Sequence, residues 1–141
     1  MNVGDPIPVL ELPPITKDQL VRYAGASGDF NPIHWDADFA RQSGYPGPIA
    51  HGMLSMAFLG RALTSWLGEP TAVLRLSARF KGVTYPGDQL TITGSVTGTG
   101  TTAGDDPTLE VSLVATKLDG TITTTGTATV LAPLTPPSEA T

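Results

Sequence analysis

The chain has 141 residues, of which 40% are hydrophobic and 15% charged, with a formal net charge of −5 and no cysteine. This length gives room for one hydrophobic core, and the acidic balance argues against nucleic-acid binding, which needs clustered Lys and Arg. The lack of cysteine excludes disulfides and thiolate chemistry, and no apolar run reaches the roughly 18 residues of a membrane-spanning helix.

The N-terminal part is predicted to form two short helices separated by a turn. The first helix is expected at residues 17–24, with Thr16 as its N-cap. Pro32 fixes its own backbone and favours a turn, after which Asp36 can cap a second helix at residues 37–43.

The longest helical pattern covers residues 52–67, after a loop rich in Gly and Pro. Its apolar residues occupy more than one stripe, which is typical of a helix largely surrounded by protein. Gly68 and Pro70 are expected to end it.

After this helix the hydrophobic pattern changes to a period of two. Turn sequences separate four segments rich in Val, Ile and Thr: residues 72–82, 89–98, 108–117 and 121–131. They predict four strands in an antiparallel meander, and so an α+β fold with a sheet wrapped on one apolar helix. Because one helix covers one face, the other face and the sheet edge are expected to need a partner, in a homodimer or heterodimer.

A single domain is expected over residues 1–131, followed by a flexible, Pro-rich tail at residues 132–141. The tail has too few large apolar groups to offset the entropy cost of ordering it. The first residues lack the basic and apolar regions of a secretory signal, so we expect a cytoplasmic protein.

The segment SGDFNPIHWD, residues 27–36, concentrates acid/base groups. The carboxyl group of Asp29 and the imidazole of His34, in a loop stiffened by Pro32, can converge on one water molecule. Asn31 is interpreted as an amide that orients this pair. The alternative is a plain turn, in which Asp29 and Asn31 accept from backbone N–H groups and His34 packs as a polar corner.

The segment AHGM, residues 50–53, lies where the loop enters the long helix. The N–H of Gly52 has no intrahelical acceptor there, so it can bind a developing oxyanion. The alternative is a simple junction at which Gly52 relieves a clash and His51 caps the helix. Ser55 lacks the sequence of a nucleophile elbow and is interpreted as a polar residue at the lip of a pocket, and Tyr23 as a wall residue.

A metal site is a further candidate, because His34, Asp36 and Asp38 are close in sequence and His51 can join them. The spacing shows no diagnostic ligand pattern, so no metal is expected.

The basic residues Arg75, Arg79 and Lys81 alternate onto one face of a predicted strand and form the single basic cluster of the sequence. This cluster can receive phosphate groups, face solvent, or form ion pairs at a subunit contact.

Together, the two polar segments resemble the MaoC-like family of (R)-specific enoyl-thioester hydratases and 3-hydroxyacyl-thioester dehydratases, which have the hot-dog fold. The resemblance covers about residues 7–131. Within the family, the sequence is especially similar to the catalytic B subunits of mycobacterial heterodimeric dehydratases. The family has two motifs. In the first, an acid and a histidine flank Asn-Pro, and the second, later in the chain, is His-Gly-Met. This sequence meets them with Asp29, Asn31, Pro32 and His34, and with His51, Gly52 and Met53.

The resemblance implies that Asp29 and His34 activate the water that adds to a double bond, or act in the reverse dehydration, and that the N–H of Gly52 binds the thioester carbonyl. It implies substrates linked to coenzyme A or acyl carrier protein, and no metal or redox cofactor. Substrate contacts are expected from Tyr23, His51, Met53 and Ser55. The alternatives are an acyl thioesterase and a non-catalytic partner or ligand-binding hot-dog subunit.

Overall fold

The structure is a computed structural model that describes residues 1–133. The predicted flexible tail therefore lies outside the described residues, except for Ala132 and Pro133. No helix within residues 1–133 combines the length and the apolar character needed to cross a lipid bilayer.

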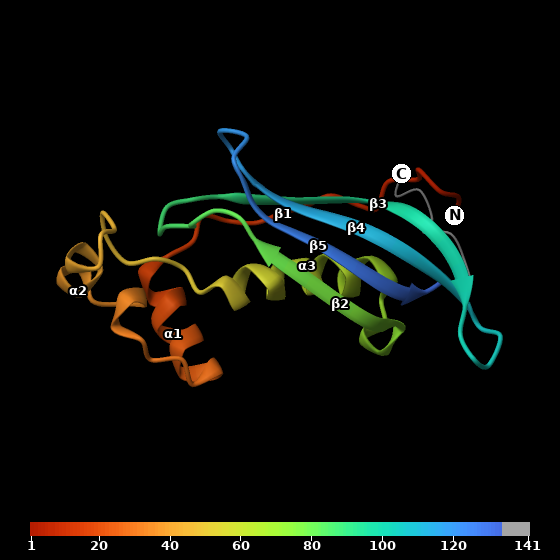
Figure 1. Ribbon diagram of the computed structural model, residues 1–141, viewed down its shortest axis with the longest axis horizontal. Helices are drawn as coiled ribbons and strands as arrows, with labels where there is room; N and C mark the ends of the chain where they lie inside the picture. The colour runs from red at the N-terminus through yellow and green to blue at the C-terminus, as the bar shows by residue number, and fades with distance from the viewer. Residues whose placement is uncertain (134–141) are drawn as a thin grey trace.

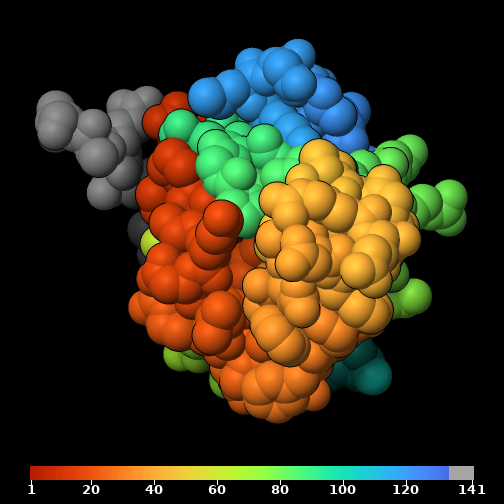
Figure 2. All heavy atoms as spheres, turned by 90° about the vertical axis from the view of Figure 1, so that its left-hand side faces the viewer, coloured from red at the N-terminus to blue at the C-terminus, as the bar shows by residue number. Residues whose placement is uncertain are grey.

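Helices and strands follow one another in the predicted order (Figure 1). They are β1 (Leu10–Glu11), α1 (Lys17–Ser27), η1 (Pro32–His34), α2 (Ala37–Gln42), α3 (Gly52–Leu67), η2 (Pro70–Ala72), β2 (Val73–Phe80), β3 (Leu90–Thr101), β4 (Pro107–Lys117) and β5 (Ile122–Leu131). Helix α3 lies along one face of the sheet, and α1 and α2 lie together at one end of the molecule (Figure 1). Seen from that end, α1, α2 and the loops around them form most of the surface (Figure 2).

Helix α1 is longer than predicted. Thr16 caps it as expected, in a capping box with Gln19, but the helix continues through Gly25. It ends at Gly28, whose φ of 73° is left-handed and whose N–H donates to the carbonyl of Ala24. Glycine lowers helix stability without ending a helix, whereas the left-handed conformation does end it.

The sheet corrects the predicted four-strand meander. Within the described residues it has five antiparallel strands in the order β1-β3-β4-β5-β2. Strands β3, β4 and β5 form the expected meander, but β2 pairs with β5 instead of β3. Alternation of apolar residues shows which face of a strand is buried, but it does not identify the neighbouring strand.

The core lies between α3 and the inner face of the sheet. The buried residues of α3 form one cluster with buried residues of the strands. From α3 this cluster includes Leu54, Phe58, Leu59 and Leu63, and from the strands it includes Ile92, Val96, Val111, Leu113 and Val130. Gly126 allows the closest approach, because a β-carbon there would lie 2.7 Å from Cδ1 of Leu59. The expectation of one apolar helix under a sheet is therefore confirmed.

The outer face of the sheet is rich in hydroxyl groups. Its exposed or half-buried residues include Thr93, Ser95, Ser112, Thr125 and Thr127. This face therefore needs no apolar partner, contrary to the sequence-based expectation. The outer edge of β2, in contrast, has no neighbouring strand in the described sheet. Its unpaired backbone groups can pair with a strand of another chain, so a partner is still expected at that edge.

Candidate active site

The loop between α1 and α2 folds as a turn that its own side chains hold. Oδ1 of Asp29 accepts from the N–H of Asn31 at 3.2 Å, and Oδ1 of Asn31 accepts from the N–H of Ile33 at 3.1 Å. Pro32 occupies the first position of η1, where its missing N–H costs nothing. The plain-turn alternative is therefore correct for Asn31, whose side chain caps η1, and for one oxygen of Asp29.

The second carboxylate oxygen of Asp29 faces His34. Oδ2 lies 3.5 Å from Nε2 of His34, and the Asp29 side chain is 52% exposed. The other ring nitrogen of His34, Nδ1, lies 2.8 Å from the carbonyl oxygen of Ile49. Because a carbonyl only accepts, Nδ1 carries a hydrogen, and Nε2 is the atom that faces the carboxylate.

His51 lies directly behind this pair. Its ring stacks on that of His34, and Nε2–H donates to the backbone carbonyl of Asp29 at 3.2 Å. The ring edge of Tyr23 packs against it, with centroids 4.8 Å apart. His51 is only 2% exposed, and burial lowers the pKa of its imidazole below the ordinary value of 6.5. His51 thus lies within the site, but its side chain does not cap α3 as the junction alternative required.

Burial also affects Tyr23 at this site. Together with the negative charge of Asp29, it raises the pKa of the Tyr23 hydroxyl above its ordinary value of 10.0, so the phenol stays protonated.

Gly52 is the first residue of α3, and its N–H therefore has no intrahelical acceptor. It lines a cavity of about 180 Å³ together with the buried Ser55 and with Phe80. A β-carbon at position 52 would lie 3.3 Å from the Phe80 ring. Met53, in contrast, is 56% exposed and does not line this cavity.

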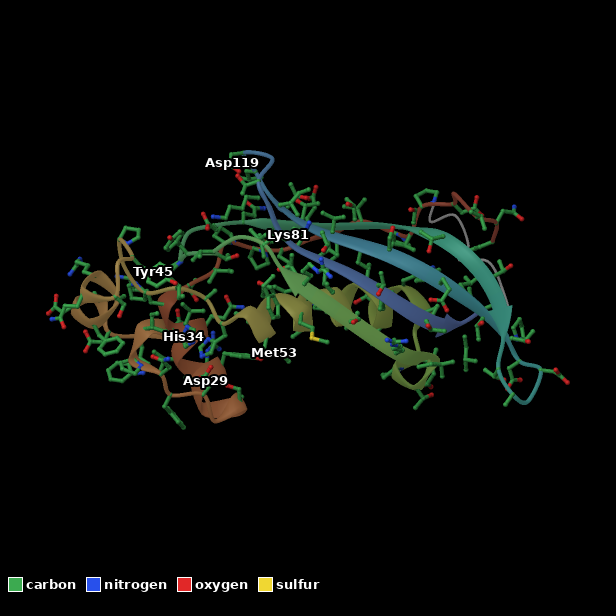
Figure 3. All side chains as sticks on the ribbon, in the orientation of Figure 1. Asp29, His34, Tyr45, Met53, Lys81 and Asp119 are labelled. Carbon is green, nitrogen blue, oxygen red and sulfur yellow. The ribbon has the colours of Figure 1, made fainter. Side chains whose placement is uncertain are left out.

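Ile49 connects the two halves of the site. Its carbonyl accepts a hydrogen bond from Nδ1 of His34, its N–H donates to the carbonyl of Ile33 at 3.1 Å, and the residue lines the Gly52 cavity. The Asp29–His34 pair and the start of α3 therefore lie on the same side of the molecule (Figure 3). Sequence reasoning missed Ile49, because a contribution made by a backbone carbonyl leaves no signal in residue type.

A metal ion could draw on a different set of residues from the one expected. Ligand atoms of Asp29, His34 and His51 lie within 4.8 Å of one another. Asp36 and Asp38 are engaged elsewhere, in the N-cap of α2 and in an ion pair with Arg41. The two rings are 21° from parallel, so their in-plane lone pairs run side by side and do not converge on one ion. The absence of a metal stays a prediction.

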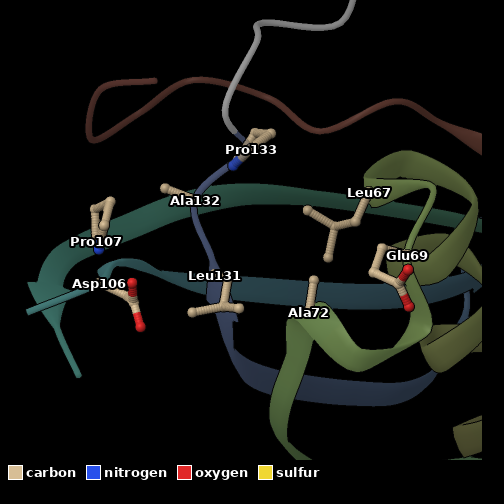
Figure 4. A pocket seen from close by; sticks show the side chains of 8 residues that line it. All are labelled: Leu67, Glu69, Ala72, Asp106, Pro107, Leu131, Ala132 and Pro133. Atoms are coloured by element: carbon tan, nitrogen blue, oxygen red, sulfur yellow. The ribbon is translucent and has the colours of Figure 1, made fainter. Parts of the chain in front are cut away.

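Another cavity, of about 580 Å³, lies at the other end of α3 (Figure 4). Its walls are Leu67, Glu69, Ala72, Asp106, Pro107, Leu131, Ala132 and Pro133. A helix of 16 residues separates it from Gly52 by roughly 20 Å. This cavity therefore takes no part in the Asp29–His34 site.

A sequence profile described as a MaoC like domain matches residues 4–118, which is most of the chain. The chain belongs to the MaoC-like family. The family expected from the sequence motifs is thereby confirmed.

Curated relatives match the chain over about half of its length. The (R)-specific enoyl-CoA hydratase of Rhodospirillum rubrum is 38% identical over 85 residues, which cover 60% of this chain and 59% of that protein. The peroxisomal enoyl-CoA hydratase 2 of Arabidopsis thaliana is 42% identical over 66 residues, 45% of this chain. The matched region spans only 21% of the length of the Arabidopsis protein.

Among solved structures, the (R)-hydratase of A. caviae matches 94% of this chain and 98% of its own, with a TM-score of 0.80 and 28% identity. The expected α+β hot-dog fold is therefore confirmed.

Proposed function

We propose that this MaoC-like chain catalyses the reversible (R)-specific hydration of 2-enoyl thioesters, which in reverse is the dehydration of (R)-3-hydroxyacyl thioesters. The observation that carries the proposal is the 3.5 Å approach of Asp29 Oδ2 to His34 Nε2 next to the first N–H of α3. Addition of water to a C=C bond next to a carbonyl requires acid/base groups and an oxyanion donor close together. Both lie on the same side of this molecule (Figure 3). The substrate is the thioester of coenzyme A or of acyl carrier protein.

The hydrogen bond from Nδ1–H to Ile49 leaves Nε2 of His34 as the working atom. Nε2 of His34 and Oδ2 of Asp29 lie 3.5 Å apart, so both can act on one substrate, and the proposed step requires that one of them carries a proton. In hydration, one group of the pair accepts a proton from water as the hydroxyl adds to the β-carbon. The other gives its proton to the α-carbon, and the two exchange roles in dehydration.

Gly52 is assigned the role of oxyanion donor. As water adds, negative charge moves onto the thioester oxygen, and the N–H at the positive end of α3 stabilises that charge. One such donor typically contributes about 3–4 kcal/mol in the transition state. Ser55 lines the cavity next to it and is assigned a contact to the thioester.

His51, Tyr23 and Asn31 are assigned positioning roles. His51 holds the backbone of Asp29 and supports the ring of His34, and Tyr23 packs against His51. Asn31 holds Oδ1 of Asp29 through its backbone N–H, which directs Oδ2 toward His34. We assign these positioning roles to His51 and Tyr23 in place of the substrate contacts expected of them. Met53 is exposed and outside the cavity lining, so it is assigned no contact within the cavity.

A partner subunit is proposed at the free edge of β2, where a second hot-dog chain, identical or not, would add its own strand. Leu74 and Phe80 on this strand are 48% and 49% exposed, and Met53 is also exposed. Sedimentation of the purified chain would show a dimer, or a monomer if the partner is a different chain. The cytoplasmic location and the independence from metals and redox cofactors stay predictions.

The direct test is the ultraviolet absorbance of crotonyl-CoA, which falls when the conjugated double bond is hydrated. We expect turnover by the purified protein, an (R)-3-hydroxy product, and no free thiol. Release of thiol without loss of the double bond would instead identify a thioesterase. Wild-type activity no higher than that of His34→Ala, on short and long enoyl thioesters, would refute the proposal.

A further inference from the structure

A second hollow lies on the outer face of the sheet, between β2 and β5. It has a volume of about 360 Å³ and is lined by Ser77, Ala78, Arg79, Lys81, Thr125, Gly126 and Thr127. We call it the β2–β5 groove. Its position follows from the strand pairing, in which Arg79 lies opposite Thr125 and Ser77 opposite Thr127.

The groove joins positive charge to hydroxyl groups. Residues 73–82 contain three of the eight Lys and Arg residues of the chain and no Asp or Glu, although the net charge of the chain is −5. The ion pairs of Lys and Arg within residues 1–133 involve Arg22, Arg41 and Lys117, so neither Arg79 nor Lys81 has an acidic partner there.

Strands β2, β4 and β5 contain one acidic side chain, that of Glu110. It accepts a hydrogen bond from Thr129, which pairs with Arg75 and not with Arg79. The Arg79 end of the groove therefore keeps its positive charge.

The groove and the Gly52 cavity lie on opposite faces of one short segment. Phe80 and Gly82 line the cavity, whereas Arg79 and Lys81, which alternate with them, line the groove. Successive side chains of a strand point to opposite faces about 3.3 Å apart along the chain. Lys81 lies at the end of β2 that is closer to His34 and Met53 (Figure 3). A long arm attached to an acyl group in the cavity can thus pass over this segment and reach the groove.

We infer that the β2–β5 groove binds the phosphate groups of the arm that carries the acyl thioester, with Arg79 and Lys81 as the charged contacts. The inference rests on the proposed hydratase function and specifies how its substrate is held. The guanidinium of Arg79 can bind a phosphate with two parallel hydrogen bonds, and the ammonium of Lys81 adds a point charge. The hydroxyls of Thr125 and Thr127 supply neutral donors. Pairing of another strand to the edge of β2 leaves these outward side chains accessible.

The test compares two substrates with the same acyl group. Crotonyl-CoA carries phosphates, and crotonyl-N-acetylcysteamine carries none. In the double variant R79A/K81A we expect KM for crotonyl-CoA to rise at least about tenfold with kcat unchanged, as loss of charge-assisted hydrogen bonds predicts. The kinetic constants for the phosphate-free thioester should not change. Lys17→Ala is the control, because Lys17 is exposed on α1 and has no ion pair among the described contacts.

Binding without turnover separates this inference from the proposed function. Calorimetry with adenosine 3′,5′-bisphosphate and with 4′-phosphopantetheine distinguishes a coenzyme A arm from a carrier-protein arm. Binding of either one by the wild type, lost in R79A/K81A and retained in Lys17→Ala, supports the groove even if neither thioester is hydrated. If neither phosphate compound binds, or if both substrates are affected equally, the inference is overturned.

Discussion

The imidazole of His51 stacks on that of His34, with ring centroids 3.6 Å apart and planes at 21°. Two imidazolium ions in this arrangement would repel each other, so one ring has to stay neutral. Burial lowers the pKa of His51, and the nearby His34 lowers it further. The ring that stays neutral is therefore that of His51.

Replacing Asp29 by Asn should abolish most activity and leave the fold intact. We expect kcat for crotonyl-CoA to fall at least about a hundredfold, because an amide cannot accept a proton from water. The amide oxygen still accepts from the N–H of Asn31, so thermal unfolding should change little. A variant with near wild-type turnover would remove Asp29 from the mechanism.

His51 should make stability depend on pH in a defined window. Its pKa in the folded state lies below 6.5, so the unfolded chain binds the proton first as the pH falls. The stabilisation is fully present above about pH 6.5 and is lost as the pH falls from there through the lowered pKa of the folded state. Urea unfolding at pH 7.5 and 5.5 measures the loss.

The variant His51→Phe keeps a flat ring and cannot titrate. It should lose less unfolding free energy than the wild type between these two pH values, and its kcat should fall because the hydrogen bond to the Asp29 carbonyl is gone. An equal loss in both proteins would show that His51 is not the titrating group.

Adding a methyl group at Gly52 should impair the oxyanion site. In Gly52→Ala the new β-carbon would lie 3.3 Å from the half-exposed Phe80 ring, so the ring shifts and the small cavity narrows. We expect kcat/KM to fall at least about tenfold with little loss of stability. Gly60→Ala is the matched control in the same helix, since its β-carbon would meet Leu76 at an ordinary 3.6 Å. Equal activity of the two variants would contradict the role of Gly52.

Gly126→Ala should destabilise the fold without changing the chemistry of the site. Its β-carbon would lie 2.7 Å from Leu59 and 3.1 Å from the carbonyl of Ser77, a crowding that typically costs about 1–3 kcal/mol. Gly98→Ala, whose nearest neighbour is Glu110 at 3.5 Å, should cost less. Chemical unfolding measures the free energy of unfolding of both variants. Equal values would show that the core near Leu59 adjusts to the added methyl group without loss of stability.

Local features of this protein were predictable from its sequence because their interactions span only a few residues. The Thr16 cap, the Asn31–Pro32 turn and the start of α3 at Gly52 each depend on neighbours within about four positions. The motif resemblance joined two of these features into one expected site and fold. Alternation along the later segments predicted strands, and the structure has strands over most of each of them.

Tertiary structure alone decided the rest, because the remaining contacts join residues far apart in the chain. His34 meets the carbonyl of Ile49 across 15 positions, and His51 meets that of Asp29 across 22. The pairing of β2 with β5 placed Arg79 opposite Thr125 and created the groove. Residue type and period cannot specify such contacts, since they depend on how whole elements pack around the core.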